Sequence, residues 1–125
     1  MLSLNTADSA DCSPLDPQML KHIEKIMGPE MTIMLIQQFM DYAPQQLAAL
    51  QQSIAIGDTE TLRQQTHQFK GESLQIGANQ LSALCQKMET LAQKGQLETA
   101  SASCAKLETE WARVKAALTQ VSRHE

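Results

Sequence analysis

The sequence predicts an all-α protein: an antiparallel up-and-down four-helix bundle with an additional short N-terminal helix. Alanine, leucine, glutamine and methionine, which are good helix formers, dominate the composition. Apolar residues recur at steps of three and four along most of the chain, the spacing of one helix face. The 5 Gly and 4 Pro residues are confined to a few places, most of them between these periodic stretches.

The first helix is expected after a flexible N-terminal tail. Residues 1–15 are rich in Ser, Asp, Thr and Asn and show no periodicity, so we assign them to that tail and residues 16–122 to the bundle domain. Asp16 followed by Pro17 is typical of a helix start. A short helix follows and stops at Gly28. One side of it is apolar, formed by Leu20, Ile23, Ile26 and Met27.

The second helix is predicted over residues 29–56, opened by Pro29. Pro44 falls inside its apolar pattern and should kink the helix rather than split it, because the spacing continues on both sides. Two helices meeting near Ala43 remain the alternative. Gly57 and Asp58 end this element and cap the next. The apolar face comprises Ile36, Phe39, Met40, Ala43, Leu47, Leu50 and Ile54. Met31, Met34 and Met40 could line a groove for a partner, but core filling is favoured for them.

Three further helices complete the predicted fold. The third spans about residues 59–75, and Gly77 separates it from the fourth, which Gly95 closes. The last helix carries the most regular pattern, from Leu97 to Val121. Short links between long amphipathic helices indicate antiparallel neighbours. The inner face of the fourth helix comprises Leu81, Leu84, Cys85, Met88, Leu91 and Ala92.

Charge and composition argue against several classes of function. The net charge is −4 and no Lys- or Arg-rich stripe appears, which disfavours nucleic-acid binding. No apolar run approaches the roughly 20 residues of a membrane span. The N-terminus lacks the features of a signal peptide. The cysteines Cys12, Cys85 and Cys104 are odd in number and form no CxxC pair, so we expect a cytoplasmic protein with reduced thiols.

Helix geometry predicts that His67 is exposed. At roughly 100° per residue, the side of the third helix opposite His67 carries the residues expected to be buried. These are Leu62, Thr66, Phe69, Ser73 and Ile76. The positions within about 60° of His67 are Glu60, Arg63, Gln64, Lys70, Gly71 and Leu74.

Gly71 is the unusual residue on this face. A glycine inside a helix costs about 1 kcal/mol relative to alanine, and on a solvent face packing between helices cannot explain it. It leaves space for another protein to approach the His67 imidazole. Lys70 suits an anion held at that ring. An exposed imidazole is largely a neutral nucleophile at cellular pH.

The stretch His67-Gln68-Phe69-Lys70-Gly71-Glu72-Ser73, followed by Gly77-Ala78, resembles the signature of histidine phosphotransfer (HPt) domains. Leu81, Cys85 and Glu89 extend the match, and the resemblance covers about residues 16–118. It implies a four-helix bundle whose exposed histidine carries a phosphoryl group between aspartates of response-regulator receiver domains in a two-component phosphorelay. A hybrid sensor histidine kinase would stand upstream.

By this resemblance, His67 matches the phosphorylated position, at Nε2, and Lys70 matches the residue that steadies phosphoryl charge. Gly71 matches the position left bare for receiver docking. Geometry alone makes Gln64, Gln68 and Leu74 docking candidates. Glu72 departs from the family pattern, in which a small residue is common, and could tune partner choice.

The chain lacks a Gly-rich phosphate loop, a Walker lysine and a kinase-like acidic cluster. We therefore expect a phosphoryl carrier rather than a self-sufficient enzyme, with no cofactor or metal of its own. In the family, Mg²⁺ on the partner receiver domain supplies the charge neutralisation. A monomer is expected, and the starting Met and loose tail favour a free-standing protein over the excised end of a hybrid kinase.

Two other functions remain open. A helical adaptor that binds receiver or kinase partners without carrying phosphate would share the same surface. A carboxylate-bridged metal bundle would need inward-facing Glu-x-x-His pairs, which this sequence lacks.

Overall fold

The computed structural model describes residues 13–124, which form five helices. They are α2 (Pro17–Met27), α3 (Pro29–Ile56), α4 (Thr59–Gln75), α5 (Asn79–Gln93) and α6 (Leu97–His124). Every predicted helix is present, with ends close to those expected from the sequence. The alternative of two helices meeting near Ala43 is wrong, because α3 runs through Pro44 without interruption.

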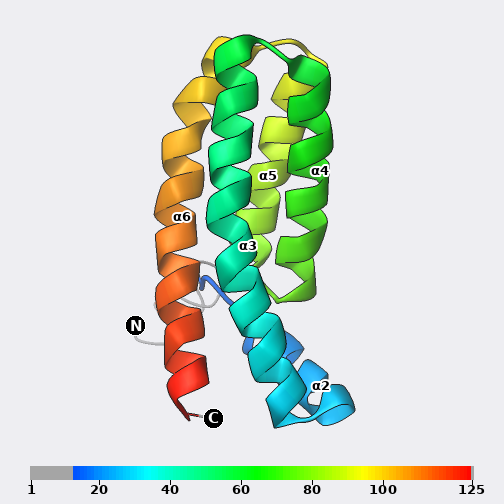
Figure 1. Ribbon diagram of the computed structural model, residues 1–125, viewed down its shortest axis with the longest axis vertical. Helices are drawn as coiled ribbons and strands as arrows, with labels where there is room; N and C mark the ends of the chain where they lie inside the picture. The colour runs from blue at the N-terminus through cyan, green and yellow to red at the C-terminus, as the bar shows by residue number, and fades with distance from the viewer. Residues whose placement is uncertain (1–12, 125) are drawn as a thin grey trace, which may run out of the picture.

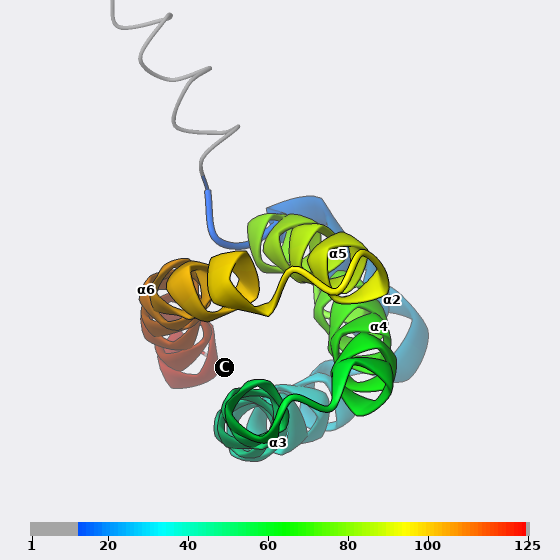
Figure 2. The same cartoon turned by 90° about the horizontal axis from the view of Figure 1, so that it is seen from above.

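The four long helices form the bundle, and each runs opposite to the helix before it (Figure 1). Contacts join α3 to α4, α4 to α5, α5 to α6 and α6 back to α3, so the helices enclose one core. Figure 2 shows this ring from above, with α2 beneath it and in contact with α3. The predicted fold class is confirmed. No helix within the described range is long and apolar enough to cross a membrane.

The helix ends follow from local sequence chemistry. The Asp16 carboxylate accepts a hydrogen bond from the Gln18 N–H at 3.0 Å, and Pro17 occupies the first turn of α2, where a missing N–H costs nothing. Gly57 adopts the left-handed conformation that closes α3. Asp58 then caps α4 by accepting from the Thr61 N–H at 3.1 Å. These capping residues determine where the helices begin and end, and so set the lengths of the helices that form the site.

The core is aliphatic except for one aromatic cluster. The Phe39 ring lies 5.7 Å from Trp111 and 6.3 Å from Phe69, and Tyr42 lies 6.1 Å from Phe69, measured between ring centroids. This cluster joins α3, α4 and α6. The largest fully buried aliphatic side chains come from all four long helices: Ile36, Leu50, Leu62, Leu81, Met88, Leu107, Leu118 and Val114.

The folded part begins earlier than predicted. We assigned Leu15 to the tail, but its side chain is buried in the core. The Asp16 N–H donates to the Gly77 carbonyl at 2.8 Å, so the segment before α2 is fixed to the turn that follows α4. Residues 1–12, including Cys12, lie outside the described range, and the flexibility of the tail stays a prediction.

The corner between α2 and α3 also differs from expectation. Ile26 and Met27 were placed on the apolar inner side of the short helix, and Met31 and Met34 were expected to fill the core. All four are about half exposed or more. In α2 only Leu20 is buried, and Ile23 packs against the core while partly exposed.

Candidate functional site

The exposed face of α4 carries the predicted site. The His67 side chain is 65 % exposed, whereas all five residues predicted for the opposite side are buried. The prediction from helix geometry, that His67 is exposed and the opposite side of the helix is buried, is therefore confirmed. Thr66, a polar residue on the buried side, is satisfied within its own helix because its hydroxyl donates to the Leu62 carbonyl at 2.9 Å.

The His67 ring is held at one nitrogen by α5. Its Nδ1 lies 3.1 Å from Oε2 of Glu89, a carboxylate whose side chain is only 8 % exposed. An ionised carboxylate can only accept, so Nδ1 carries the proton in this pair. In the neutral imidazole the lone pair then belongs to Nε2, the nitrogen farther from the backbone. The geometry fixes one tautomer and leaves Nε2 as the nucleophilic atom.

Glu89 also holds Lys70. The Lys70 Nζ donates to Oε1 of Glu89 at 3.1 Å and to Oε1 of Gln86 at 2.8 Å. Burial acts to raise the pKa of Glu89, but the hydrogen bonds from Lys70 and His67 outweigh burial and lower that pKa overall. One ionised carboxylate therefore bridges the histidine and the lysine.

Gly71 has no structural explanation within the chain. A Cβ built at this position would meet nothing within 4 Å, and Gly71 does not adopt the positive φ that favours glycine. It is exposed, next to Lys70 on the surface of α4. The expectation that internal packing does not require this glycine is confirmed.

The remaining predicted docking residues lie on the same helix. Gln64, Gln68 and Leu74 are all exposed, and Leu74 is 53 % accessible despite its apolar side chain. Gln64 is not entirely free, since its amide donates to Glu60 at 3.1 Å. Their roles in docking stay predictions.

Glu89 and Gln86 were missed as site residues by sequence reasoning. The signal for Glu89 was present, because this acidic residue lies on the apolar stripe of α5 between Cys85 and Ala92. A carboxylate at a core position is rarely buried without a partner. Sequence alone did not show that its partners would be His67 and Lys70 on α4.

A metal centre finds no support in the described range. Among residues 13–124, no group of three or more His, Cys, Asp or Glu side chains is placed to hold a metal ion. The site consists of a histidine, a lysine, a carboxylate and an amide, with the bare position of Gly71 beside them on α4.

Comparison with known proteins agrees with this geometry. Residues 34–122 match the family described as Hpt domain. This chain belongs to the Hpt domain family. The Hpt protein is similar to the crystal structure of histidine-containing phosphotransfer protein B (HptB) from Pseudomonas aeruginosa PAO1, with 28 % identity and a TM-score of 0.86. That match covers 90 % of this chain and 96 % of the other. No curated protein matches the chain significantly.

Membership defines the general function of this Hpt protein. It is a histidine phosphotransfer protein of phosphorelay signalling, a phosphocarrier rather than an enzyme in the usual sense. Members of the family interact with receiver domains and kinases. An exposed histidine anchored from behind by a carboxylate suits that role.

Proposed function

We propose that His67 is the residue of this Hpt protein that carries the phosphoryl group, between aspartates of response-regulator receiver domains. The observation that supports this most directly is the Nδ1–Glu89 hydrogen bond of 3.1 Å on a side chain that is 65 % exposed. The hydrogen bond fixes the tautomer of the imidazole, and the exposure of the side chain leaves Nε2 accessible to a partner. His22 on α2, the other histidine whose side chain the structure describes, is exposed and has no such partner.

The transfer step follows from this arrangement. The Nε2 lone pair attacks the phosphorus of an aspartyl phosphate, and the bond from phosphorus to the aspartate oxygen breaks as the N–P bond forms. Nδ1 keeps its proton, so the ring acquires positive charge, which the Glu89 carboxylate stabilises from behind. The reverse sequence passes the group to a second receiver aspartate.

Lys70 would supply a cation near the phosphoryl oxygens. Its Nζ lies within hydrogen-bond distance of Glu89 and Gln86, and its flexible stem allows the ammonium to move toward the phosphoryl group. Mg²⁺ on the partner receiver domain would provide the remaining neutralisation. The chain would bind no ATP and no metal of its own.

The surface around His67 would receive the partner. Gly71 leaves room beside the ring, and Gln64, Gln68 and Leu74 surround it on α4. A monomer in the cytoplasm would present this face in turn to a hybrid sensor histidine kinase, through its receiver domain, and to a response regulator.

Incubation with receiver domains charged by acetyl phosphate tests the proposal. We expect an acid-labile, base-stable label on the wild type and no label on His67→Gln. His22→Gln, which removes another exposed histidine, is the matched control and should be labelled like the wild type. Label that survives in His67→Gln would assign the acceptor elsewhere. An unlabelled wild type that still binds receivers would instead identify the adaptor.

A further inference from the structure

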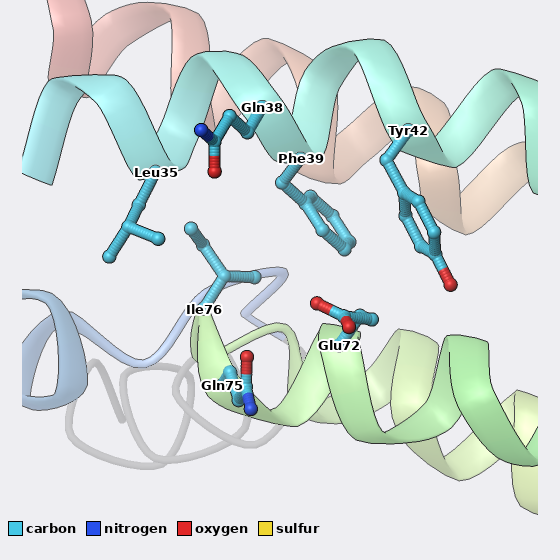
Figure 3. A pocket seen from close by; sticks show the side chains of 7 residues that line it. All are labelled: Leu35, Gln38, Phe39, Tyr42, Glu72, Gln75 and Ile76. Atoms are coloured by element: carbon cyan, nitrogen blue, oxygen red, sulfur yellow. The ribbon is translucent and has the colours of Figure 1, made fainter.

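A cavity lies between α3 and α4, away from His67. It has a volume of about 260 Å³ and opens toward solvent. This is slightly below the range of about 300–1,000 Å³ that is common for small-molecule sites. The site proposed above uses none of its walls. They are formed by Leu35, Gln38, Phe39, Tyr42, Glu72, Gln75 and Ile76 (Figure 3).

Much of the cavity wall is apolar and aromatic. Figure 3 shows the rings of Phe39 and Tyr42 extending from α3 toward α4, with Leu35 and Ile76 at the end nearer α2. The two rings are 6.3 Å apart between centroids, and Phe39 is held from behind by Trp111. Such a wall offers a rigid surface to an apolar group, and aromatic faces attract cations.

Glu72 gives the cavity its charge. It is the one charged residue of the lining, and its carboxylate lies below the Phe39 ring in Figure 3. Within residues 13–124, neither an ion pair nor a hydrogen bond engages the side chains of Glu72, Gln38 or Gln75. This contrasts with the His67 face, where Glu89, Lys70 and Gln86 are all paired.

The unpaired charge of Glu72 also affects Tyr42. Its hydroxyl is shielded from solvent and has no hydrogen-bond partner among the described residues. Burial, followed by the negative charge of Glu72, raises the pKa of this phenol to about 12. The negative charge of Glu72 thus acts on the Tyr42 phenol, and no cationic side chain among the residues that line the cavity offsets it.

We propose that this cavity binds an organic cation, an ammonium, amidinium or guanidinium group on an apolar stem. The charged group would pair with the Glu72 carboxylate and donate to the carbonyl oxygens of Gln38 and Gln75. The stem would lie against Phe39 and Ile76. An anion is disfavoured because the lining contains no Lys, Arg or His. Glu72 is also one of the positions at which the sequence departs from the HPt signature.

A titration of the full chain followed by NMR tests the chemistry of the cavity. Benzamidine, a flat cation, is the probe, and benzamide, its neutral analogue of the same shape, is the control. We expect saturable benzamidine shifts at the backbone amides of Gln38, Tyr42 and Glu72, with benzamide bound at least about tenfold more weakly. Equal binding of the two probes, or shifts confined to another surface, would overturn the proposal.

A pair of variants measures how much the Glu72 carboxylate contributes to benzamidine binding. Glu72→Gln should weaken benzamidine binding about tenfold, while Glu98→Gln, which removes an exposed carboxylate from the first turn of α6, should leave it unchanged. Unchanged affinity in Glu72→Gln would remove Glu72 from the site. None of these measurements requires phosphoryl transfer, so they stand independently of the role proposed for His67.

The source of the cation can be distinguished in the receiver transfer assay. If benzamidine slows transfer to the wild type but not to Glu72→Gln, the natural occupant is a basic side chain of the docked partner. If benzamidine binds and transfer is unchanged, the occupant is a free organic cation. Both results support a cation site and differ only in where the cation comes from.

Discussion

Two glycines on either side of the C-terminal end of α4 show how differently the same residue can be used. Gly77 has a φ of 84°, and a Cβ there would lie 3.1 Å from the Met19 Cβ and 3.2 Å from the Asp16 carbonyl oxygen. At Gly71 a Cβ would meet nothing within 4 Å. The first glycine satisfies a requirement of the fold. The second satisfies none within the described residues, which agrees with the docking role proposed for this position.

The largest effect should come from Gly77→Ala. The left-handed backbone and the two close contacts should together lower the free energy of unfolding by roughly 2–4 kcal/mol. Gly95→Ala is the matched control, because Gly95 has a φ of 70° but an added Cβ would meet nothing within 4 Å. That control should lose only about 1 kcal/mol. Urea unfolding measures both, and equal losses would mean that the contacts at Gly77 are unimportant.

Glu89→Gln should have the next largest effect on stability. Loss of a carboxylate that bridges Lys70 and His67 should lower the free energy of unfolding by roughly 1–2 kcal/mol near pH 7. The variant should also be phosphorylated more slowly, since an amide no longer fixes the His67 tautomer as a carboxylate does.

This effect should depend on pH in a defined direction. The pKa of Glu89 is lowered in the folded protein, so its contribution is complete above the ordinary glutamate pKa and is lost as pH falls through the lower, folded value. Urea unfolding at a series of pH values from 7 to 3 should show the wild type converging on Glu89→Gln only at the acidic end. A constant difference across the series would contradict the assigned bridge.

Substitutions at Gly71 should separate stability from function. Gly71→Ala should raise the free energy of unfolding by about 0.5–1 kcal/mol, because alanine is the better helix former and has space. Gly71→Gln should keep or slightly raise helicity by circular dichroism while slowing phosphoryl transfer from a receiver. If Gly71→Gln transferred the phosphoryl group at the wild-type rate, the proposal that Gly71 leaves space for a docked receiver domain would be contradicted.

Leu74→Ala should have the smallest effect on stability. Leu74 is 53 % exposed, so its truncation should change the free energy of unfolding by less than about 0.5 kcal/mol. Receiver binding measured by calorimetry should nevertheless weaken several-fold. Ile56→Ala, which truncates another exposed apolar residue at the C-terminal end of α3, should leave the affinity unchanged. Equal affinities for wild type and Leu74→Ala would exclude Leu74 from the docking surface.

The parts of the fold that depend on local chemistry were predictable. Asp16, Gly57 and Asp58 act at helix ends through their own backbone and nearest neighbours, and sequence placed them correctly. The exposure of His67 followed from helical periodicity, since Phe69 and Leu62 had to face the core.

Features that depend on the placement of one helix against another were not predictable. The pairing of Glu89 with His67 requires the axial register between α4 and α5, which periodicity within each helix does not define. The burial of Leu15 depends on the hydrogen bond between Asp16 and Gly77 at a corner assembled from distant segments. Ile26 is exposed for the same reason, because the length of an apolar stripe does not reveal how much of it a neighbour covers.

The shared Glu89 carboxylate has a consequence for how long this carrier would hold its cargo. Lys70 already neutralises Glu89 in the resting protein, so a phosphoryl group on His67 would have to compete with a buried anion for a single ammonium. Lys70 could move to the phosphoryl group while the positively charged ring of phosphorylated His67 remains the partner of Glu89, and it would return to the carboxylate once the group leaves. Because transfer restores the resting pairing, such an arrangement favours rapid delivery over storage.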